Sequence, residues 1–344
     1  MSSLAFHAVK IYVVFLICTL YRGWATSSIL KEALIPYVSS SLSKLSKPSH
    51  ADAISAAIKS AFVQLDDRIL STAEEAIRNY PQASAEGLAA LAPAAAGSCA
   101  LLTIYDPLSS TLRTAVAGDS RAVLGSWSAD TNSHSAKPLS EDQTGFNEAE
   151  VERLSNLHPG EDKIIDPASG RLLGMAITRA FGDHRWKWPL DLIQKAKDDF
   201  FCTSPRPHYA TPPYMTAEPE VTTTQVRTDD FAILASDGLW DHISSEDAVS
   251  CVSTWLAEAR GQKAAVKDAS STSLVVDKED WLSWRVTKDD FIFEDGDNAA
   301  VCLVKNAFGG RKRELFRGAM TSQDPLSRYV RDDVTVLVIF FNEP

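Results

Sequence analysis

Two apolar stretches of the chain are each bordered by aspartates, and this arrangement constrains the fold more than any other feature. Residues 231–234 run into Asp237 and Asp241, and residues 334–341 directly follow Asp332 and Asp333. Two carboxylates about 4 Å apart repel each other by roughly 4 kcal/mol at an effective dielectric near 20. A divalent cation would remove that repulsion, and oxygen donors favour magnesium, manganese or calcium over zinc. The pattern therefore indicates a metal-assisted hydrolase; the alternative is that each aspartate only hydrogen-bonds a turn.

Charge and cysteine content narrow the class of protein. The formal net charge of −11 does not suggest a nucleic-acid-binding surface. The five cysteines are scattered without a CxxC spacing, which argues against a structural zinc site or a disulfide framework and fits a reducing compartment. There is no GxxxxGK loop and no GxGxxG after a strand, so a nucleotide-cradling site lacks support. At 344 residues, one large domain is as plausible as two.

The N-terminal segment contains an apolar run over residues 11–20. It is shorter than the roughly 20 apolar residues that a membrane span needs. Lys10 precedes it as in a signal peptide, but no clear small-x-small cleavage site follows. We favour a buried strand here and expect no membrane contact from residues 4–20; a membrane tether is the weaker alternative.

Helical spacing of apolar residues recurs along the chain. We expect a helix over 26–45 that kinks or breaks at Pro36, and a second helix that is capped by Ser49 and ends near Pro81. Residues 82–97 indicate a loop or a weak helix. Further helices are expected over 147–157, after Ser244, and over 298–308.

Strand signals fill the middle of the chain. We expect strands over 100–105, 111–117 and 121–127, with Gly118-Asp119-Ser120 as a tight hairpin connection and 128–138 as a surface loop. Strands grouped in the middle and at the C-terminus, with helices between them, favour an α/β layered sandwich with antiparallel strands. Two stretches near 197–219 and 260–296 indicate insertions.

Six short motifs then occur in a fixed order along almost the whole chain. The six motifs are residues 97–100, 117–124, 139–143, 178–183, 235–241 and 331–336. Together they resemble the metal-dependent serine/threonine protein phosphatases of the type 2C, or PPM, family. Finer features at 23–26, 211–220 and 298–310 resemble the mitochondrial pyruvate dehydrogenase phosphatase branch.

The resemblance implies two antiparallel β-sheets flanked by antiparallel helix pairs, with a phosphatase domain over 23–342 behind an atypical segment at 1–22. It also implies two Mg²⁺ or Mn²⁺ ions, with a third in some cases, and a metal-activated water that hydrolyses phosphoserine or phosphothreonine. No protein nucleophile is then needed. By motif, Asp237 and Asp332 match metal ligands, and Asp142 and Asp241 match residues around a weaker third position.

Two other aspartates lie in family motifs. We expect Asp119 and Asp183 to belong to turns and strand ends rather than to catalysis. The partner implied by the family is a phosphorylated protein, and the branch suggests a pyruvate dehydrogenase subunit. The branch also implies a mitochondrial location, with a cytoplasmic one otherwise, although no Arg-rich presequence is visible.

The N-terminal metal-binding motifs of the family are missing. Where the family carries Asp-Gly-His, whose aspartate bridges both metals, this chain has Thr19, Leu20 and Tyr21, and the family's first strand is absent upstream. Neither threonine nor leucine supplies the negative charge that holds two cations together. We favour an incomplete or mis-spliced version of an active phosphatase; the alternative is a pseudophosphatase that binds phosphoproteins without hydrolysing them.

Overall fold

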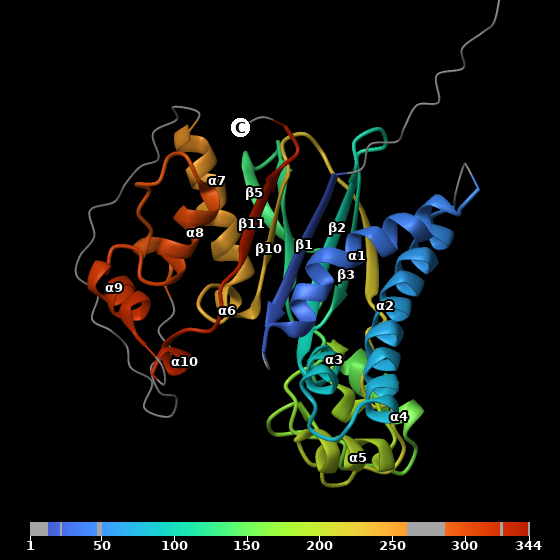
Figure 1. Cartoon of the computed structure of the whole chain (residues 1–344). Helices are drawn as coiled ribbons and strands as arrows, with labels where there is room; N and C mark the ends of the chain where they lie inside the picture. The colour runs from blue at the N-terminus through green and yellow to red at the C-terminus, as the bar shows by residue number, and fades with distance from the viewer. Residues whose placement is uncertain (1–12, 21–22, 47–49, 260–285, 324–325, 343–344) are drawn as a thin grey trace, which may run out of the picture.

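The computed structural model describes residues 13–20, 23–46, 50–259, 286–323 and 326–342. Two antiparallel sheets stand face to face at the centre of the molecule, with helices on both outer faces (Figure 1). The α/β sandwich with helix pairs that the sequence predicts is therefore confirmed. No helix within the described ranges is long and apolar enough to span a membrane.

The first sheet has the strand order β1-β2-β3-β9, and β8 also pairs with β2. Its edge strand β1 confirms the predicted N-terminal strand: its backbone pairs antiparallel with β2, Ile17 lying opposite Leu101, and Ile17 is 1% exposed. The strands are β1 (Val13–Leu20), β2 (Gly97–Asp106), β3 (Thr111–Ala117), β8 (Phe181–Gly182) and β9 (Glu220–Gln225).

The second sheet has the order β11-β10-β4-β5. A small core between the two sheets joins Ile17 and Leu101 of the first to Leu124 and Leu234 of the second. The strands of the second sheet are β4 (Arg121–Ser128), β5 (Ser133–Pro138), β10 (Phe231–Ala235) and β11 (Val336–Phe340); a separate ribbon pairs β6 (Ile165–Asp166) with β7 (Arg171–Leu172).

The helices cover the sheets in two groups and fill a lower lobe (Figure 1). Helices α1 (Ala25–Ser43) and α2 (Ala51–Asn79) pack on the first sheet, and α7 (Ser245–Ala259) and α8 (Ala299–Ala307) pack on the second. The lobe contains α3 (Ala85–Ala95), α4 (Glu148–Leu157) and α5 (Leu190–Phe200), and the remaining helices are α6 (Asp237–Trp240), α9 (Arg313–Thr321) and α10 (Ser327–Val330).

Several local predictions need correction. The break expected at Pro36 is absent: α1 continues through this exposed proline, because Leu34 and Val38 on either side are buried in the core and hold the helix. Of the loop or weak helix expected over 82–97, the helix is the one found, as α3, whereas α5 was not predicted at all. Ser49, the expected cap of α2, lies outside the described residues, as does most of the expected insertion at 260–296.

Two strand predictions are also wrong. Residues 133–138 form the edge strand β5 instead of a loop; its side chains are largely polar and exposed, so only its backbone pairing with β4 reveals it. The connection Gly118–Ser120 is not a hairpin, because β3 pairs with β2 and β9 whereas β4 pairs with β5 and β10. The chain instead crosses here from one sheet to the other.

A buried ion pair ties α2 to the segment that follows β8. Lys187 Nζ lies 2.6 Å from Asp66 Oδ2, and the two side chains are only 5% and 7% exposed. Asp66 Oδ1 also accepts a hydrogen bond from the Gly182 amide, and Lys187 donates to the Ala180 carbonyl. This network holds the lobe against the first sheet.

Removing one partner should therefore be costly, because a buried charge is left without compensation. We expect Lys187→Met to lower the free energy of unfolding by about 3 kcal/mol. The matched control is Lys59→Met, which breaks the exposed pair with Glu218, whose side chains are 41% and 48% exposed, and should cost under about 1 kcal/mol. Urea denaturation of both variants measures the difference, and equal losses would contradict the structural role of the buried pair.

Candidate metal centre

The two acidic motifs meet at the lower end of the second sheet (Figure 1). Strands β10 and β11 are antiparallel, with Ala235 opposite Val336, so the segment after β10 and the segment before β11 leave the sheet at the same end. Ser236 joins them: its hydroxyl donates to the Asp333 carbonyl at 2.9 Å and accepts from the Thr335 amide at 3.0 Å. Asp237 and Asp332 are thereby brought to one place from nearly a hundred residues apart.

The crossover between the sheets adds a third acidic residue to this place. Asp119 lies between β3 and β4, and its Oδ1 is 3.3 Å from Cys99 Sγ on β2. The Gly118 amide donates to Gln143 Oε1 at 2.7 Å. This hydrogen bond holds Gln143, and with it the preceding residue Asp142, beside the crossover. Gly118 has a φ of +124°, and a Cβ at this position would collide with the Cys99 side chain, so the crossover requires glycine.

The electrostatics show that these carboxylates act on one another. Burial, followed by repulsion from Asp119, Asp332 and Asp241, raises the pKa of Asp237 to about 8. Burial chiefly raises the pKa of Asp119 to about 6, with repulsion from Asp142 and Asp241 adding to it. We call these five residues the aspartate cluster. All four predicted site residues lie in it, together with Asp119, which we had expected to be structural.

The proximity of Asp119 to the other aspartates could have been suspected from sequence, because Asp119 follows a buried strand directly, as Asp237 nearly does. The hairpin interpretation hid this, since a hairpin would have kept it within one sheet. Asp183, in contrast, fits the expected structural role. It is 1% exposed, follows β8 in the left-handed conformation, and burial raises its pKa to about 7 against the opposing effect of Lys187.

Asp142 differs from the other members of the cluster because it forms a salt bridge with the guanidinium of Arg121. Arg121 donates from Nε to Asp142 Oδ1 at 2.9 Å and from its terminal nitrogen to Oδ2 at 2.5 Å. The guanidinium also stacks 5.3 Å from the Trp240 ring and reaches Ser245. In this arrangement both oxygens of Asp142 are engaged, and its predicted part in a third metal position stays a prediction.

The donor set fits a divalent cation in chemistry and charge, because the cluster offers hard carboxylate oxygens and the raised pKa of Asp237 marks uncompensated negative charge. It falls short in number. Within the described residues, no three His, Cys, Asp or Glu side chains form a group that could hold a metal ion. The aspartates are thus gathered without completing a closed coordination site.

The end of β1 pairs with a residue that contacts the aspartate cluster. In the register of β1 and β2, Thr19 is opposite Cys99 and Leu20 is opposite Ser98. Because Cys99 Sγ contacts Asp119, the backbone of Thr19 borders the aspartate cluster. Tyr21, the third residue at the expected Asp-Gly-His position, lies outside the described residues.

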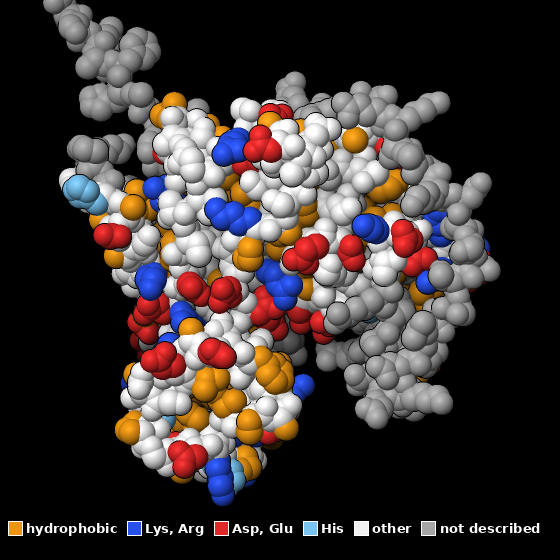
Figure 2. Space-filling model, turned by 180° about the vertical axis from the view of Figure 1, so that it is seen from behind, with side chains coloured by type: hydrophobic (Ala, Val, Ile, Leu, Met, Phe, Trp, Pro, Cys, Tyr) orange, Lys and Arg blue, Asp and Glu red, His pale blue; other side chains and the backbone are white. Residues whose placement is uncertain are grey.

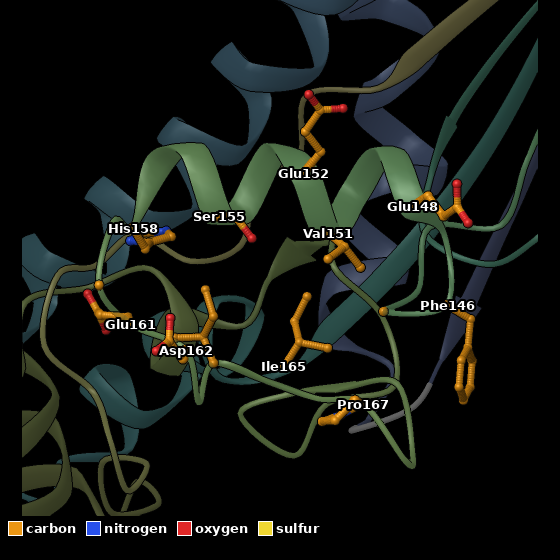
Figure 3. Close-up of a pocket in the computed structure, with 13 residues that line it drawn as sticks. Phe146, Glu148, Val151, Glu152, Ser155, His158, Glu161, Asp162, Ile165 and Pro167 are labelled. Atoms are coloured by element: carbon orange, nitrogen blue, oxygen red, sulfur yellow. The ribbon is translucent and has the colours of Figure 1, made fainter.

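A pocket of about 580 Å³ lies between α4 and the loop that follows it (Figure 3). Val151 projects from α4 toward Ile165 across the opening, whereas Glu152 points to the other side of the helix. The pocket begins close to Asp142, since Asn147 at the start of α4 donates to the Asp142 carbonyl at 3.1 Å. Hydrophobic side chains are exposed on the surface of the lobe around this pocket (Figure 2). Phe146, which lines the pocket, is 68% exposed.

The raised pKa of Asp237 predicts how stability depends on pH. Its folded pKa of about 8 exceeds the ordinary value of 3.8, so ionised Asp237 disfavours the fold. The destabilisation is absent at pH values below about 4, grows as the pH rises to about 8, and then levels off. In EDTA, Asp237→Asn should therefore melt above the wild type by several degrees at pH 8, and the two should converge toward pH 4.

Thermal denaturation at several pH values measures this gap. Asp229→Asn, in the exposed turn before β10, is the control and should show no gap that grows with pH. Adding Mn²⁺ at pH 8 should raise the melting temperature of the wild type more than that of Asp237→Asn. A constant offset across the pH range would contradict the electrostatic origin of the effect.

The chain is similar in sequence to known protein phosphatases. A protein phosphatase 2C homolog of Schizosaccharomyces pombe is 38% identical over 333 residues, which cover 94% of this chain and 72% of the relative. The mitochondrial pyruvate dehydrogenase phosphatase 1 of Saccharomyces cerevisiae is 33% identical, covering 94% and 61%. The human mitochondrial pyruvate dehydrogenase phosphatase 2 is 39% identical, covering 67% and 45%. The chain thus spans between about half and three quarters of these relatives.

Solved structures show the same fold. A serine-threonine phosphatase 2C from Toxoplasma gondii superposes with a TM-score of 0.53 at 15% identity, covering 97% of this chain and 86% of that one. A sex determining protein of C. elegans gives a TM-score of 0.55 at 15% identity, covering 96% and 57%. Residues 30–273 match the family model described as Protein phosphatase 2C. The chain therefore belongs to the protein phosphatase 2C family of serine/threonine protein phosphatases.

Proposed function

We propose that this chain is built to hydrolyse phosphoserine and phosphothreonine in proteins with the help of Mg²⁺ or Mn²⁺. The observation that carries the proposal is the convergence of Asp237 and Asp332 at the end of the second sheet, where burial, followed by repulsion from Asp119, Asp332 and Asp241, raises the pKa of Asp237 to about 8. Bound divalent cations would neutralise the phosphate and make an attacking water more acidic. The family is generally dependent on these metals, which supports the same assignment.

The residues of the chain have separate parts in this proposal. Asp237 and Asp332 would hold the metal, and Ser236 keeps their two segments together through its bonds to Asp333 and Thr335. Asp241 and Asp142 would border a further metal position. Arg121 would have to release Asp142 for that purpose, and until then it holds this carboxylate in place through two hydrogen bonds.

A second candidate function is a phosphoprotein-binding module with impaired catalysis. Two observations favour it. The strand end that borders the aspartate cluster carries Thr19 where the family has its bridging aspartate. The described residues also contain no group of three metal-binding side chains. Both observations concern the carboxylate that is missing at position 19. Substitutions that restore it can therefore distinguish a phosphatase from a binding module.

Only the names of the relatives indicate a substrate and a cellular location for this chain. Relatives from yeast and human are named mitochondrial pyruvate dehydrogenase phosphatases, at 33% and 39% identity. We propose a phosphorylated pyruvate dehydrogenase subunit as the substrate and the mitochondrion as the location. The phosphatase domain is proposed to extend over 23–342.

The metal ligands can be tested by substitution. We expect Asp237→Asn and Asp332→Asn each to lower Mn²⁺-dependent phosphopeptide hydrolysis at least 100-fold, because each removes one negative oxygen donor. Asp229→Asn is the control and should retain wild-type turnover, since it lies in an exposed turn at the opposite end of β10. Phosphate release with Mn²⁺ and with EDTA measures the effect, and hydrolysis that persists in EDTA would contradict metal dependence.

The missing motif can be tested by restoring it. We expect the triple variant Thr19→Asp, Leu20→Gly, Tyr21→His to raise Mn²⁺-dependent turnover at least tenfold over the wild type, because it places a carboxylate beside the aspartate cluster. Phosphate release and phosphopeptide retention are measured together. A wild type that retains phosphopeptide without hydrolysing it, beside an active triple variant, indicates the binding module. A wild type already as active as the variant shows that the motif is dispensable.

A further inference from the structure

Two buried cysteines face each other across the α7–α8 interface on the outer side of the second sheet. Cys251 lies in the middle of α7 and Cys302 in the first half of α8, and they are 1% and 0% exposed. The two helices lie side by side (Figure 1). Both thiols are reduced in the structure.

A single amide group holds both sulfur atoms. Asn306 Nδ2 lies 3.5 Å from Cys251 Sγ and 3.4 Å from Cys302 Sγ. The same nitrogen reaches the carbonyls of Ile292 and Cys302, each at 3.0 Å, so the side chain of Asn306 is fixed. The sulfurs are therefore neighbours around one donor, and not merely two cysteines in one hydrophobic core.

The two thiols also differ in acidity. Hydrogen bonding with Cys251, with a further contribution from the Asn306 amide, lowers the pKa of Cys302 against the opposing effect of burial. The same interaction raises the pKa of Cys251. A more acidic thiol beside a protonated one is the arrangement in which the first is oxidised and the second resolves the product.

The remaining cysteines lack this arrangement. Burial raises the pKa of Cys18 to about 12 and also raises that of Cys202. Cys99 instead donates to a carboxylate, Asp119, at 3.3 Å. All five cysteines lie within the described ranges, and among them only Cys251 and Cys302 share a hydrogen-bond donor.

We propose that Cys251 and Cys302 form an oxidation site that closes to an intramolecular disulfide when the protein meets a peroxide. The Cys302 thiolate attacks hydrogen peroxide and becomes a sulfenic acid, and the hydroxide that leaves takes up the released proton as water. The sulfur of Cys251 then attacks the sulfenic sulfur, and the hydroxyl leaves with the Cys251 proton as a second water. Two thiols and one peroxide thus give one disulfide and two waters.

The bond would join the helix that follows α6 to the helix that packs beside it. Helix α7 begins five residues after Trp240, and it packs on β4 and β5 of the sheet that ends at the aspartate cluster. The disulfide would tie the two outer helices of the second sheet together. This inference does not depend on the proposed phosphatase activity.

The experiment uses the full chain, reduced and then treated with hydrogen peroxide. Titration of thiols under denaturing conditions should fall from five to three and return to five with dithiothreitol. Tryptic digestion without reductant should give one cross-linked pair, with Cys251 in the peptide 228–260 and Cys302 in the peptide 289–305. A count that stays at five, a disulfide between other cysteines, or single thiols oxidised to sulfinic acid would each overturn the proposal.

Variants separate this pair from general oxidation. Cys251→Ser and Cys302→Ser should each abolish the cross-link, whereas Cys202→Ser should form it as the wild type does. The oxidised wild type should melt at a higher temperature than the reduced form, because the disulfide restricts the unfolded chain. If the serine variants fail to fold, the peptide map and thiol count of the wild type still decide the question.

Discussion

The site depends on one repulsive interaction: carboxylates from distant parts of the chain meet at one end of a two-sheet sandwich. Repulsion from Asp119, Asp332 and Asp241 adds to burial in raising the pKa of Asp237. Such a gathering disfavours the fold unless other contacts hold it. Ser236 supplies two of them by bonding the segments on either side, and Arg121 supplies another by neutralising Asp142.

The sandwich explains why these side chains stay together. The inner core between the sheets includes Ile17, Leu101 and Leu234, so the strands that carry the aspartates cannot slide independently. The buried pair of Lys187 and Asp66 holds the lobe against this core. The structure is thus rigid around a cluster of like charges, and a divalent cation is the ligand that such a cluster favours.

Sequence reasoning found the acidic motifs because each lies beside an apolar strand, a local pattern that is visible without the fold. It missed Asp119 for a physical reason. A short connection of glycine, aspartate and serine is typical of a hairpin, and only pairing with distant strands shows that β3 and β4 belong to different sheets. Strand β5 was missed for a related reason, since its polar side chains carry no strand signal and its backbone bonds alone define it.

The amino-acid sequence by itself determined the family, most helices and strands, and the choice of Asp237 and Asp332 as candidate metal ligands, because each motif and each periodicity is formed by neighbours within a few residues. The tertiary structure alone decided that Asp119 joins them, that Arg121 engages Asp142, and that Cys251 meets Cys302. Arg121 and Asp142 are 21 positions apart in the chain, Cys251 and Cys302 are 51 apart, and Asp119 and Asp237 are 118 apart. Their proximity is set by strand pairing and helix packing, which no local pattern encodes.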